Sequence, residues 1–221
     1  MLSIKNNSKY LAIAILIGGK STRFGSDKGL YKFRGKPLIS HLLDKIYQDD
    51  RDIFIVASSI EQVQTYINKI NLKNITAFII DDNSIISDST LHTPIIGLYS
   101  AFNELNNLGY KKAYVLSCDI PLIKKEVINY LITCSMNFEC CIPQWDNGFL
   151  EPLCAIYPIK KALILTEENI KSKNYRLINI LNKTWKIKYI SIENTFKRID
   201  EKLVSFININ EPLDLKKLEN L

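Results

Sequence analysis

A C-x-x-C motif, an apolar run of membrane-spanning length and a linker rich in Pro, Gly or Ser are all missing from this chain of 221 residues. Its five cysteines are an odd number, and no two of them stand at C-x-x-C spacing. This argues against a disulfide framework or a zinc site and favours reduced, mostly buried thiols in a cytoplasmic protein. Because 47% of the residues are hydrophobic, a chain of this length can bury a sufficient core without such crosslinks.

The first apolar run, residues 11–17, is far shorter than the roughly 20 residues that a membrane-spanning helix needs. Lysines precede it, as in a signal peptide, but no small-residue cleavage site follows it. We therefore expect a buried first strand there, and no membrane segment.

Apolar segments of strand length recur along the chain, at residues 11–17, 53–57, 75–80, 113–117, 139–142, 153–157, 187–192 and 204–207. The early ones are continuous rather than alternating, as in strands that are covered on both faces. Between them, residues 38–47 and 95–105 keep helical spacing, and Pro37, Pro94 and Pro212 suit first helical turns. This alternation predicts an α/β fold: a single-domain three-layer αβα sandwich with a mainly parallel, Rossmann-like sheet.

Ligands of such sheets bind at the carboxyl ends of the strands. The places to look are therefore Gly18 onward and residues 58–59, 81–82 and 118–121. Residues 81–93 are polar and without periodicity, which predicts a mobile loop.

Glycine and positive charge are concentrated in one segment. Five of the eight glycines fall between positions 18 and 35, and six basic residues stand from Lys20 to Lys36 against one acid, Asp27. Adjacent Gly18 and Gly19, directly after a strand, let the backbone turn and approach a ligand closely. This favours phosphate binding, although a tight surface turn with solvated charges would have the same composition. The spacing matches neither a P-loop nor a G-x-G-x-x-G dinucleotide fingerprint.

Four blocks in order resemble the nucleotidyltransferases of sugar phosphates and cofactors, and among these most closely the molybdenum cofactor guanylyltransferases. The blocks are Leu16-Ile17-Gly18-Gly19 with Arg23 and Asp27-Lys28; Thr93-Pro94-Ile95-Ile96-Gly97; Ser117-Cys118-Asp119-Ile120-Pro121; and Phe206-Ile207-Asn208-Ile209-Asn210-Glu211-Pro212. The resemblance covers essentially all of residues 1–221. It implies a nucleotide-binding half over about residues 10–135 and an acceptor-binding half over about residues 136–221.

The resemblance also implies a reaction: Mg²⁺-dependent transfer of GMP from GTP to molybdopterin-bound molybdenum, releasing pyrophosphate. The implied catalytic residues are Arg23, Lys28 and Asp119, and Asp119 is the implied metal ligand. The implied nucleotide-binding residues are Leu16, Ile17, Gly18, Gly19, Lys28, Asp82 and Asp119, and the implied acceptor-binding residues are Arg176, Asn208 and Asn210. The implied handover partners are molybdenum-insertion proteins and client molybdoenzymes or their chaperones.

Several of these residues have structural alternatives. Asp119 ends a buried strand and must be paired or bound to a metal, yet Pro121 would also let it cap a following helix. Asp82 stands in ordinary turn sequence, and Asn210 would suit the cap of a helix beginning near Pro212. His41 falls within a helix, and no sequence feature assigns a role to His92.

Two departures from the family pattern concern the base contact and the acceptor-side loop. The family's usual asparagine after the second strand is missing, and Ala57-Ser58-Ser59 stands in its place; an expected glycine before Arg176 is also absent. Use of CTP or a sugar phosphate therefore stays open, although Gly18-Gly19 resembles the guanylyl enzymes better than their cytidylyl relatives.

Rivals from other classes are a non-catalytic nucleotide-binding module and a nucleic-acid-binding protein. The first is disfavoured because Arg23, Lys28 and Asp119 are all present. The second is disfavoured because the basic residues gather in one loop instead of interleaving with aromatic residues.

Overall fold

A seven-stranded sheet runs through the computed structural model, which describes residues 9–18, 27–46, 51–86 and 93–219. The strand order is β5-β4-β1-β6-β8-β7-β9. The strands are β1 (Leu11–Leu16), β4 (Ile53–Ala57), β5 (Ala77–Ile80), β6 (Lys112–Ser117), β7 (Cys140–Gln144), β8 (Cys154–Pro158) and β9 (Ile187–Ser191). All neighbours are parallel except at β8, which is antiparallel to both β6 and β7. The mainly parallel sheet is confirmed.

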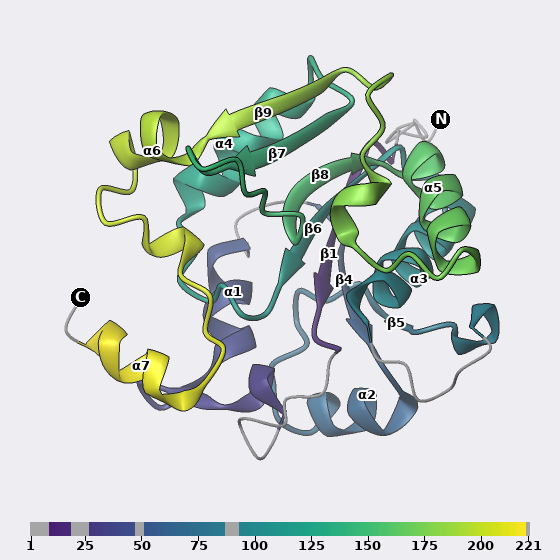
Figure 1. The fold of residues 1–221 in the computed structure, drawn as a ribbon. Helices are drawn as coiled ribbons and strands as arrows, with labels where there is room; N and C mark the ends of the chain where they lie inside the picture. The colour runs from purple at the N-terminus through teal and green to yellow at the C-terminus, as the bar shows by residue number, and fades with distance from the viewer. Residues whose placement is uncertain (1–8, 19–26, 47–50, 87–92, 220–221) are drawn as a thin grey trace, which may run out of the picture.

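Helices cover both faces of this sheet and give the three expected layers (Figure 1). One face packs against α1 (Leu38–Ile46), α2 (Ile60–Ile67) and α4 (Lys125–Ser135), and the other against α3 (Pro94–Asn107) and α5 (Ile159–Lys171). Every residue of the central strand β1 is buried, which is why its sequence is continuously apolar. In the described part of the chain, no helix combines the length and the apolar character that a bilayer span requires.

A small hairpin, β2 (Lys32–Phe33) and β3 (Lys36–Pro37), lies between the glycine-rich segment and α1. Its turn needs a left-handed backbone, with φ of 48° at Arg34 and 77° at Gly35. Phe33 of the hairpin packs in one cluster with Ile209 and Leu215. The C-terminal segment, including α7 (Pro212–Glu219), therefore packs beside this hairpin.

Two expectations about elements are wrong. Residues 204–207 form a 3₁₀ turn, η6 (Val204–Phe206), instead of a strand, because the side chain of Asp200 accepts the backbone N–H of Ser205 at 2.8 Å and Leu203 is left-handed. Helix α1 begins at Leu38, because Pro37 still pairs within the hairpin. Pro94 and Pro212 do begin their helices, as expected. Within the expected loop, residues 83–85 form the 3₁₀ turn η3 (Asn83–Ile85), and residues 87–92 lie outside the described chain.

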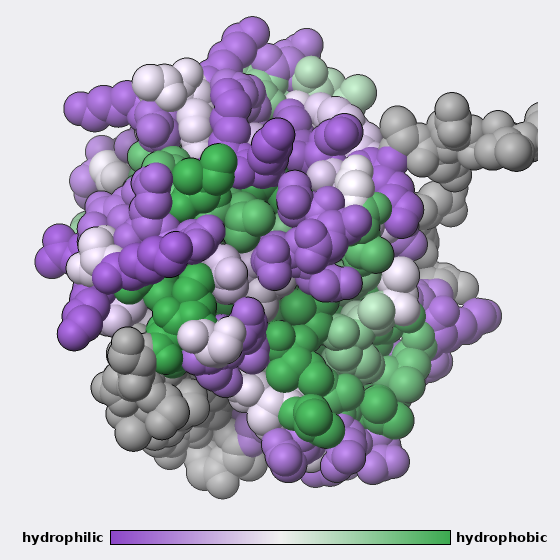
Figure 2. Space-filling model, turned by 90° about the vertical axis from the view of Figure 1, so that its right-hand side faces the viewer, coloured by the Kyte–Doolittle hydropathy of each residue, from purple (hydrophilic) through white to green (hydrophobic). Residues whose placement is uncertain are grey.

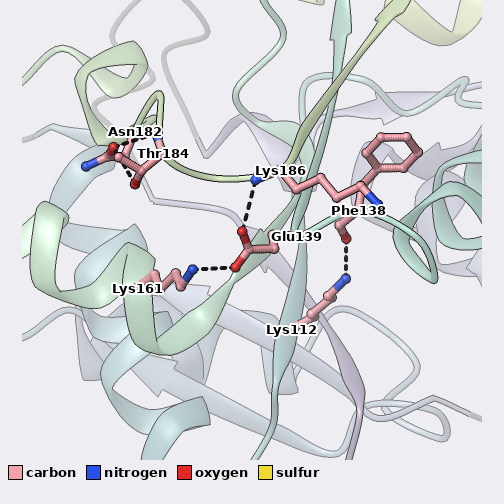
Figure 3. A network of polar contacts seen from close by, with 7 residues as sticks. All are labelled: Lys112, Phe138, Glu139, Lys161, Asn182, Thr184 and Lys186. Carbon is pink, nitrogen blue, oxygen red and sulfur yellow. Dashed lines mark hydrogen bonds and ion pairs between the residues drawn. The ribbon is translucent and has the colours of Figure 1, made fainter.

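A polar network joins four elements at the amino end of β6 (Figure 3). Lys112, the first residue of β6, donates from Nζ to the carbonyl oxygen of Phe138 at 2.5 Å. The carboxylate of Glu139 accepts from Nζ of Lys161 at 2.5 Å and from the backbone N–H of Lys186 at 2.9 Å. The network ties β6 to the segment after α4, to α5 and to the segment before β9, at the end of the sheet opposite the strand ends discussed next.

Candidate active site

The carboxyl ends of four neighbouring parallel strands form one edge of the sheet. The chain leaves β5, β4, β1 and β6 at this edge, so Asp81, Ser58, Gly18 and Asp119 follow four adjacent strand ends in that order. Backbone bonds extend the pairing beyond the strands, as between the N–H of Asp81 and the oxygen of Ala57 at 2.8 Å. The four strand ends therefore lie side by side, at the position where α/β sheets bind their ligands.

Lys28 and Asp119 form an ion pair at this edge, with 3.3 Å between Nζ and Oδ2. Their side chains are 18% and 21% exposed, so the pair is shielded but still reachable by a ligand. Lys28 begins the 3₁₀ turn η2 (Lys28–Leu30), which Asp27 caps by accepting the N–H of Gly29 at 3.0 Å. The structure thus brings together two of the three residues that the resemblance implies for catalysis.

The structure does not give Asp119 the role of a helix cap. The next helix, α4, begins only at Lys125, and its cap position is Lys124. Asp119 instead lies in the turn that follows β6, where its backbone oxygen accepts the N–H of Ile209 at 2.8 Å. Its carboxylate is therefore available to the lysine and to a ligand rather than committed to a helix.

A pocket opens beside Asp81, on the other side of the end of β1. Its lining residues are Leu16, Gly18, Val56, Ser58, Asp81, Asn83, Thr93, Pro94, Ile96 and Gly97. A Cβ atom added at Gly97 would lie 3.4 Å from Oδ1 of Asp81 and 3.3 Å from Cδ2 of Leu16. One added at Gly18 would lie 3.7 Å from Oδ2 of Asp81. Both glycines therefore keep the space around this carboxylate open.

Asp81 carries an unsatisfied charge into the pocket. Its Oδ1 is buried and accepts no hydrogen bond from the described residues. Burial raises the pKa of its carboxyl to about 6, because the charged form loses its hydration. Such a group calls for a ligand that brings hydrogen-bond donors.

Asp82, the residue that the resemblance assigned to the nucleotide, has a different environment. Its Oδ1 accepts from the N–H of Ser84 at 3.0 Å and from the hydroxyl of Ser84 at 2.6 Å, which caps η3. This is the turn role given above as its alternative, and a nucleotide contact by Asp82 stays a prediction. The geometry favours Asp81, which sequence reasoning placed at the edge but did not select.

Asn208 and Asn210 flank the backbone bond between Ile209 and Asp119. Both side chains are exposed, whereas Ile209 is buried. Helix α7 begins at Pro212, and Oδ2 of Asp214 accepts the N–H groups of Asn210 and Glu211 at 2.9 and 3.1 Å. Asp214 therefore satisfies two backbone N–H groups before this helix, and Glu211 rather than Asn210 directly precedes its first residue.

Trp145 and Glu151 are polar neighbours of this region that sequence reasoning did not assign. Nε1 of Trp145 donates to Oε1 of Glu151 at 2.7 Å, and the ring of Trp145 packs edge-on against Phe206. Burial raises the pKa of Glu151, and the charge of Asp119 raises it further. Glu151 thus lies within electrostatic reach of Asp119. The sequence signal that could have found it is the segment Glu151-Pro152-Leu153, a carboxylate directly before the apolar run at residues 153–157.

The other residues that the resemblance implied, and the two histidines, are partly within and partly outside the described chain. Leu16, Ile17 and Gly18 lie at the end of β1, and Arg176 is an exposed residue before the turn η4 (Leu177–Ile180), where an acceptor contact stays a prediction. Gly19, Arg23 and His92 lie outside the described residues. His41 contacts the backbone oxygen of Phe33 through Nε2 at 2.8 Å, which is a structural role.

The fold and the residues at its carboxyl edge are those of a class: α/β proteins whose ligands bind where the chain leaves the parallel strands. Residues 13–183 match the model of the MobA-like NTP transferase domain, and the chain belongs to this family.

Similar proteins extend the match to nearly the whole chain. A probable molybdenum cofactor guanylyltransferase of Pyrococcus horikoshii is 37% identical, over 93% of this chain and 97% of its own length. One of Aquifex aeolicus is 32% identical, over 96% and 91%. The crystal structure of molybdopterin-guanine dinucleotide biosynthesis protein A from Archaeoglobus fulgidus aligns with a TM-score of 0.74 and 26% identity, covering 95% of this chain and 97% of that one.

Proposed function

We propose that the protein is a molybdenum cofactor guanylyltransferase, which transfers GMP from GTP to the terminal phosphate of the molybdopterin-bound molybdenum cofactor. The oxygen of that phosphate bonds to the α-phosphorus of GTP, and the bond to the β-phosphate breaks, releasing pyrophosphate. The attacking group is already an anion, so no general base is required. The observation that carries this proposal is the Lys28–Asp119 pair beside a pocket with an unsatisfied carboxylate, in a chain with these relatives.

The pocket beside Asp81 suits guanine. The Watson–Crick edge of guanine presents two adjacent donors, N1–H and the 2-amino group, and one carboxylate accepts both at once. Cytosine presents only one donor on that edge, its 4-amino group, beside two acceptors. The family's usual asparagine after β4 is missing, and of the segment 57–59 that stands in its place, Ser58 lines the pocket. We assign base recognition to Asp81, with the backbone at Gly18 beside it.

The residues around Asp119 fit magnesium held mainly by phosphates and water. Mg²⁺ typically takes one or two protein carboxylates and completes its shell with substrate oxygens and waters. Asp119 provides one such carboxylate, and among the described residues no three His, Cys, Asp or Glu side chains gather into a fuller metal cage. When bound, the ion would neutralise charge on the triphosphate. Lys28, beside Asp119, would meet the α-phosphoryl group and the leaving pyrophosphate.

The acceptor would bind on the side of Asp119 that faces residues 208–210. Asn208 and Asn210 offer amide groups there, and Arg176 would add a cation for the pterin phosphate. This is the acceptor-binding half, about residues 136–221. Reduced thiols support a cytoplasmic location, because all five cysteines are free. Molybdenum-insertion proteins and client molybdoenzymes or their chaperones are the proposed handover partners.

The test is a change of base preference. In Asp81→Asn, the amide keeps one acceptor for N1–H but turns a donor toward the 2-amino group of guanine. Xanthine carries a carbonyl at that position, so the variant should prefer XTP. We expect kcat/KM with GTP to fall on the order of 100-fold, since two hydrogen bonds to a charged group are disturbed, and kcat/KM with XTP to rise.

Asp82→Asn is the matched control and should leave the preference for GTP unchanged. If Asp82→Asn rather than Asp81→Asn changes the preference, the base is read by Asp82. If wild type transfers CMP from CTP in preference to GMP, the guanylyl assignment is wrong.

A further inference from the structure

The carboxylate of Asp27 is held by α2. Its Oδ1 accepts from the hydroxyl of Tyr66 at 2.5 Å and from the N–H of Gly29 at 3.0 Å. Its Oδ2 accepts from Nε2 of Gln62 at 2.5 Å. Gln62 and Tyr66 stand four residues apart in α2 and therefore lie on one face of the helix. Asp27 directly precedes Lys28, so this face fixes the backbone from which the lysine extends.

Gln62 also binds the ends of two strands. Its Nε2 donates to the backbone oxygen of Ile17 at 3.2 Å, and its Oε1 accepts from the N–H and the hydroxyl of Ser58 at 2.8 and 3.0 Å. Both halves of the amide are thus used, each in the role its chemistry allows. One side chain connects the end of β1, the end of β4 and the residue before Lys28.

The Tyr66 side chain fills the space beside Gly29. It is fully buried, and burial raises the pKa of its hydroxyl, which keeps it a neutral donor to Asp27. A Cβ atom added at Gly29 would lie 2.2 Å from the Tyr66 oxygen. Gly29 is therefore required because the tyrosine hydroxyl occupies the place of its side chain.

We propose that Asp27, Gln62 and Tyr66 are positioning residues that hold Lys28 against Asp119 for nucleotidyl transfer. None of the three lines the pocket beside Asp81, and within the described residues their side-chain hydrogen bonds join Ile17, Ser58, Gly29 and one another. Their effect on the reaction passes through Lys28. The kinetic part of the test rests on the proposed function, and a second readout does not.

The substrate-independent readout is the rate at which an amine-directed reagent labels Lys28, followed by mass spectrometry. Tyr66→Phe removes only the hydroxyl, and Gln62→Ala removes the amide. Each should raise the labelling rate of Lys28 several-fold, because the ion pair with Asp119 is held less firmly. Tyr110→Phe is the matched control, since Tyr110 is also a buried tyrosine whose hydroxyl donates to an aspartate, Asp52, before the amino end of β4. It should leave the labelling of Lys28 unchanged.

The kinetic readout is a double-mutant cycle with Lys28→Ala. Tyr66→Phe should lower kcat about 10-fold with little change in the Kd of Mg·GTP, and should lower it no further in the Lys28→Ala background. Equal losses in both backgrounds would overturn the proposal and leave a merely structural role. Unchanged labelling of Lys28 in both Tyr66→Phe and Gln62→Ala would overturn it even if wild type does not transfer GMP.

A rescue experiment tests the contact itself. Gly29→Ala should lower kcat and raise the labelling rate of Lys28, because the new methyl group displaces the Tyr66 hydroxyl. Adding Tyr66→Phe to Gly29→Ala should recover part of the loss, since the nearest remaining ring atom, Cζ, lies 3.3 Å from the added Cβ. Additive damage in the double variant would contradict the proposed contact.

Discussion

The charge of Asp81 weakens the ligand-free fold, because its Oδ1 is buried and accepts no hydrogen bond from the residues that the structure describes. Its pKa is raised from 3.8 to about 6, so the folded protein binds more protons than the unfolded chain between these values. Stability should therefore fall as pH rises from about 4 to above 6, and about 3 kcal/mol is an upper estimate at 1.36 kcal/mol per unit. Urea unfolding across this range measures the slope.

Asp81→Asn removes that titration, so its stability should vary less over the same range and exceed that of wild type at pH 7. Asp82→Asn serves as the comparison, because it replaces a carboxylate that already accepts two hydrogen bonds. An unchanged slope in Asp81→Asn would show that other groups cause the pH dependence. GTP should restore stability in wild type at pH 7, since guanine supplies the missing donors.

A substitution at Lys28 should lower turnover far more than it lowers stability. Its ion pair with Asp119 is partly exposed, and Lys28→Ala should change the free energy of unfolding by about 1 kcal/mol or less. Turnover should fall about 10²- to 10³-fold, because the ammonium meets charge that shifts during transfer. Lys28→Arg keeps the charge on a planar group and should recover only part of the activity. Steady-state kinetics measure the loss of turnover, and thermal melts measure the change in stability. Near-normal turnover in Lys28→Ala would show that this residue takes no part in the reaction.

At the scale of elements, β5 is the outermost strand on its side of the sheet, and it is partly exposed. Ala77 is exposed, and no residue of the strand is charged, so β5 lacks the usual protection against pairing with another chain. Figure 2, which views the side of the molecule with α3 and α5, shows apolar surface gathered in the lower part of that face. Ala77→Lys should therefore reduce light scattering during heating while changing stability by no more than about 0.5 kcal/mol. Ala77→Val, which adds no charge, should not reduce it.

The elements that the sequence predicted well are those whose own residues determine them. β1 and β4 are continuously apolar because they are buried on both faces, and their bounds match the expected ones within one residue. Residues 204–207 have a similar composition, but the side chain of Asp200 and the left-handed Leu203 make them a 3₁₀ turn. A hydrogen bond from a side chain to the backbone, such as the one that Asp200 makes, cannot be predicted from the composition of the segment.

The same distinction holds for the site. Gly18, Lys28 and Asp119 follow strands or motifs and could be assigned from their position in the sequence. The choice between Asp81 and Asp82 depends on how the chain turns after β5, which only the packing of α3 decides. Gln62 and Tyr66 lie on a helix face that looks ordinary in sequence, because their partners come from elsewhere in the chain.

At the scale of the whole molecule, the strand order would keep the two proposed substrates apart. The parallel strands β5, β4, β1 and β6 bring Asp81 and Asp119 to opposite sides of the end of β1, with the pocket proposed for the base on one side and the Lys28–Asp119 pair on the other. The antiparallel strand β8 then reverses the chain, and later segments return to Asp119 through Ile209. The α-phosphate of a nucleotide would thus lie between its own pocket and the acceptor.

This arrangement predicts how nucleotides stabilise the molecule as a whole. In the proposed function, GTP with Mg²⁺ would contact both the pocket and the ion pair, whereas CTP would contact the pair but offer Asp81 a single donor. At one hundred times its dissociation constant, a ligand raises stability by about 2.7 kcal/mol, which is several degrees in Tm for a protein of this size. We expect the order of melting shifts to be GTP above CTP in wild type, and the difference to shrink in Asp81→Asn. A larger shift with CTP, or a preference for GTP that survives Asp81→Asn intact, would show that the base is bound elsewhere.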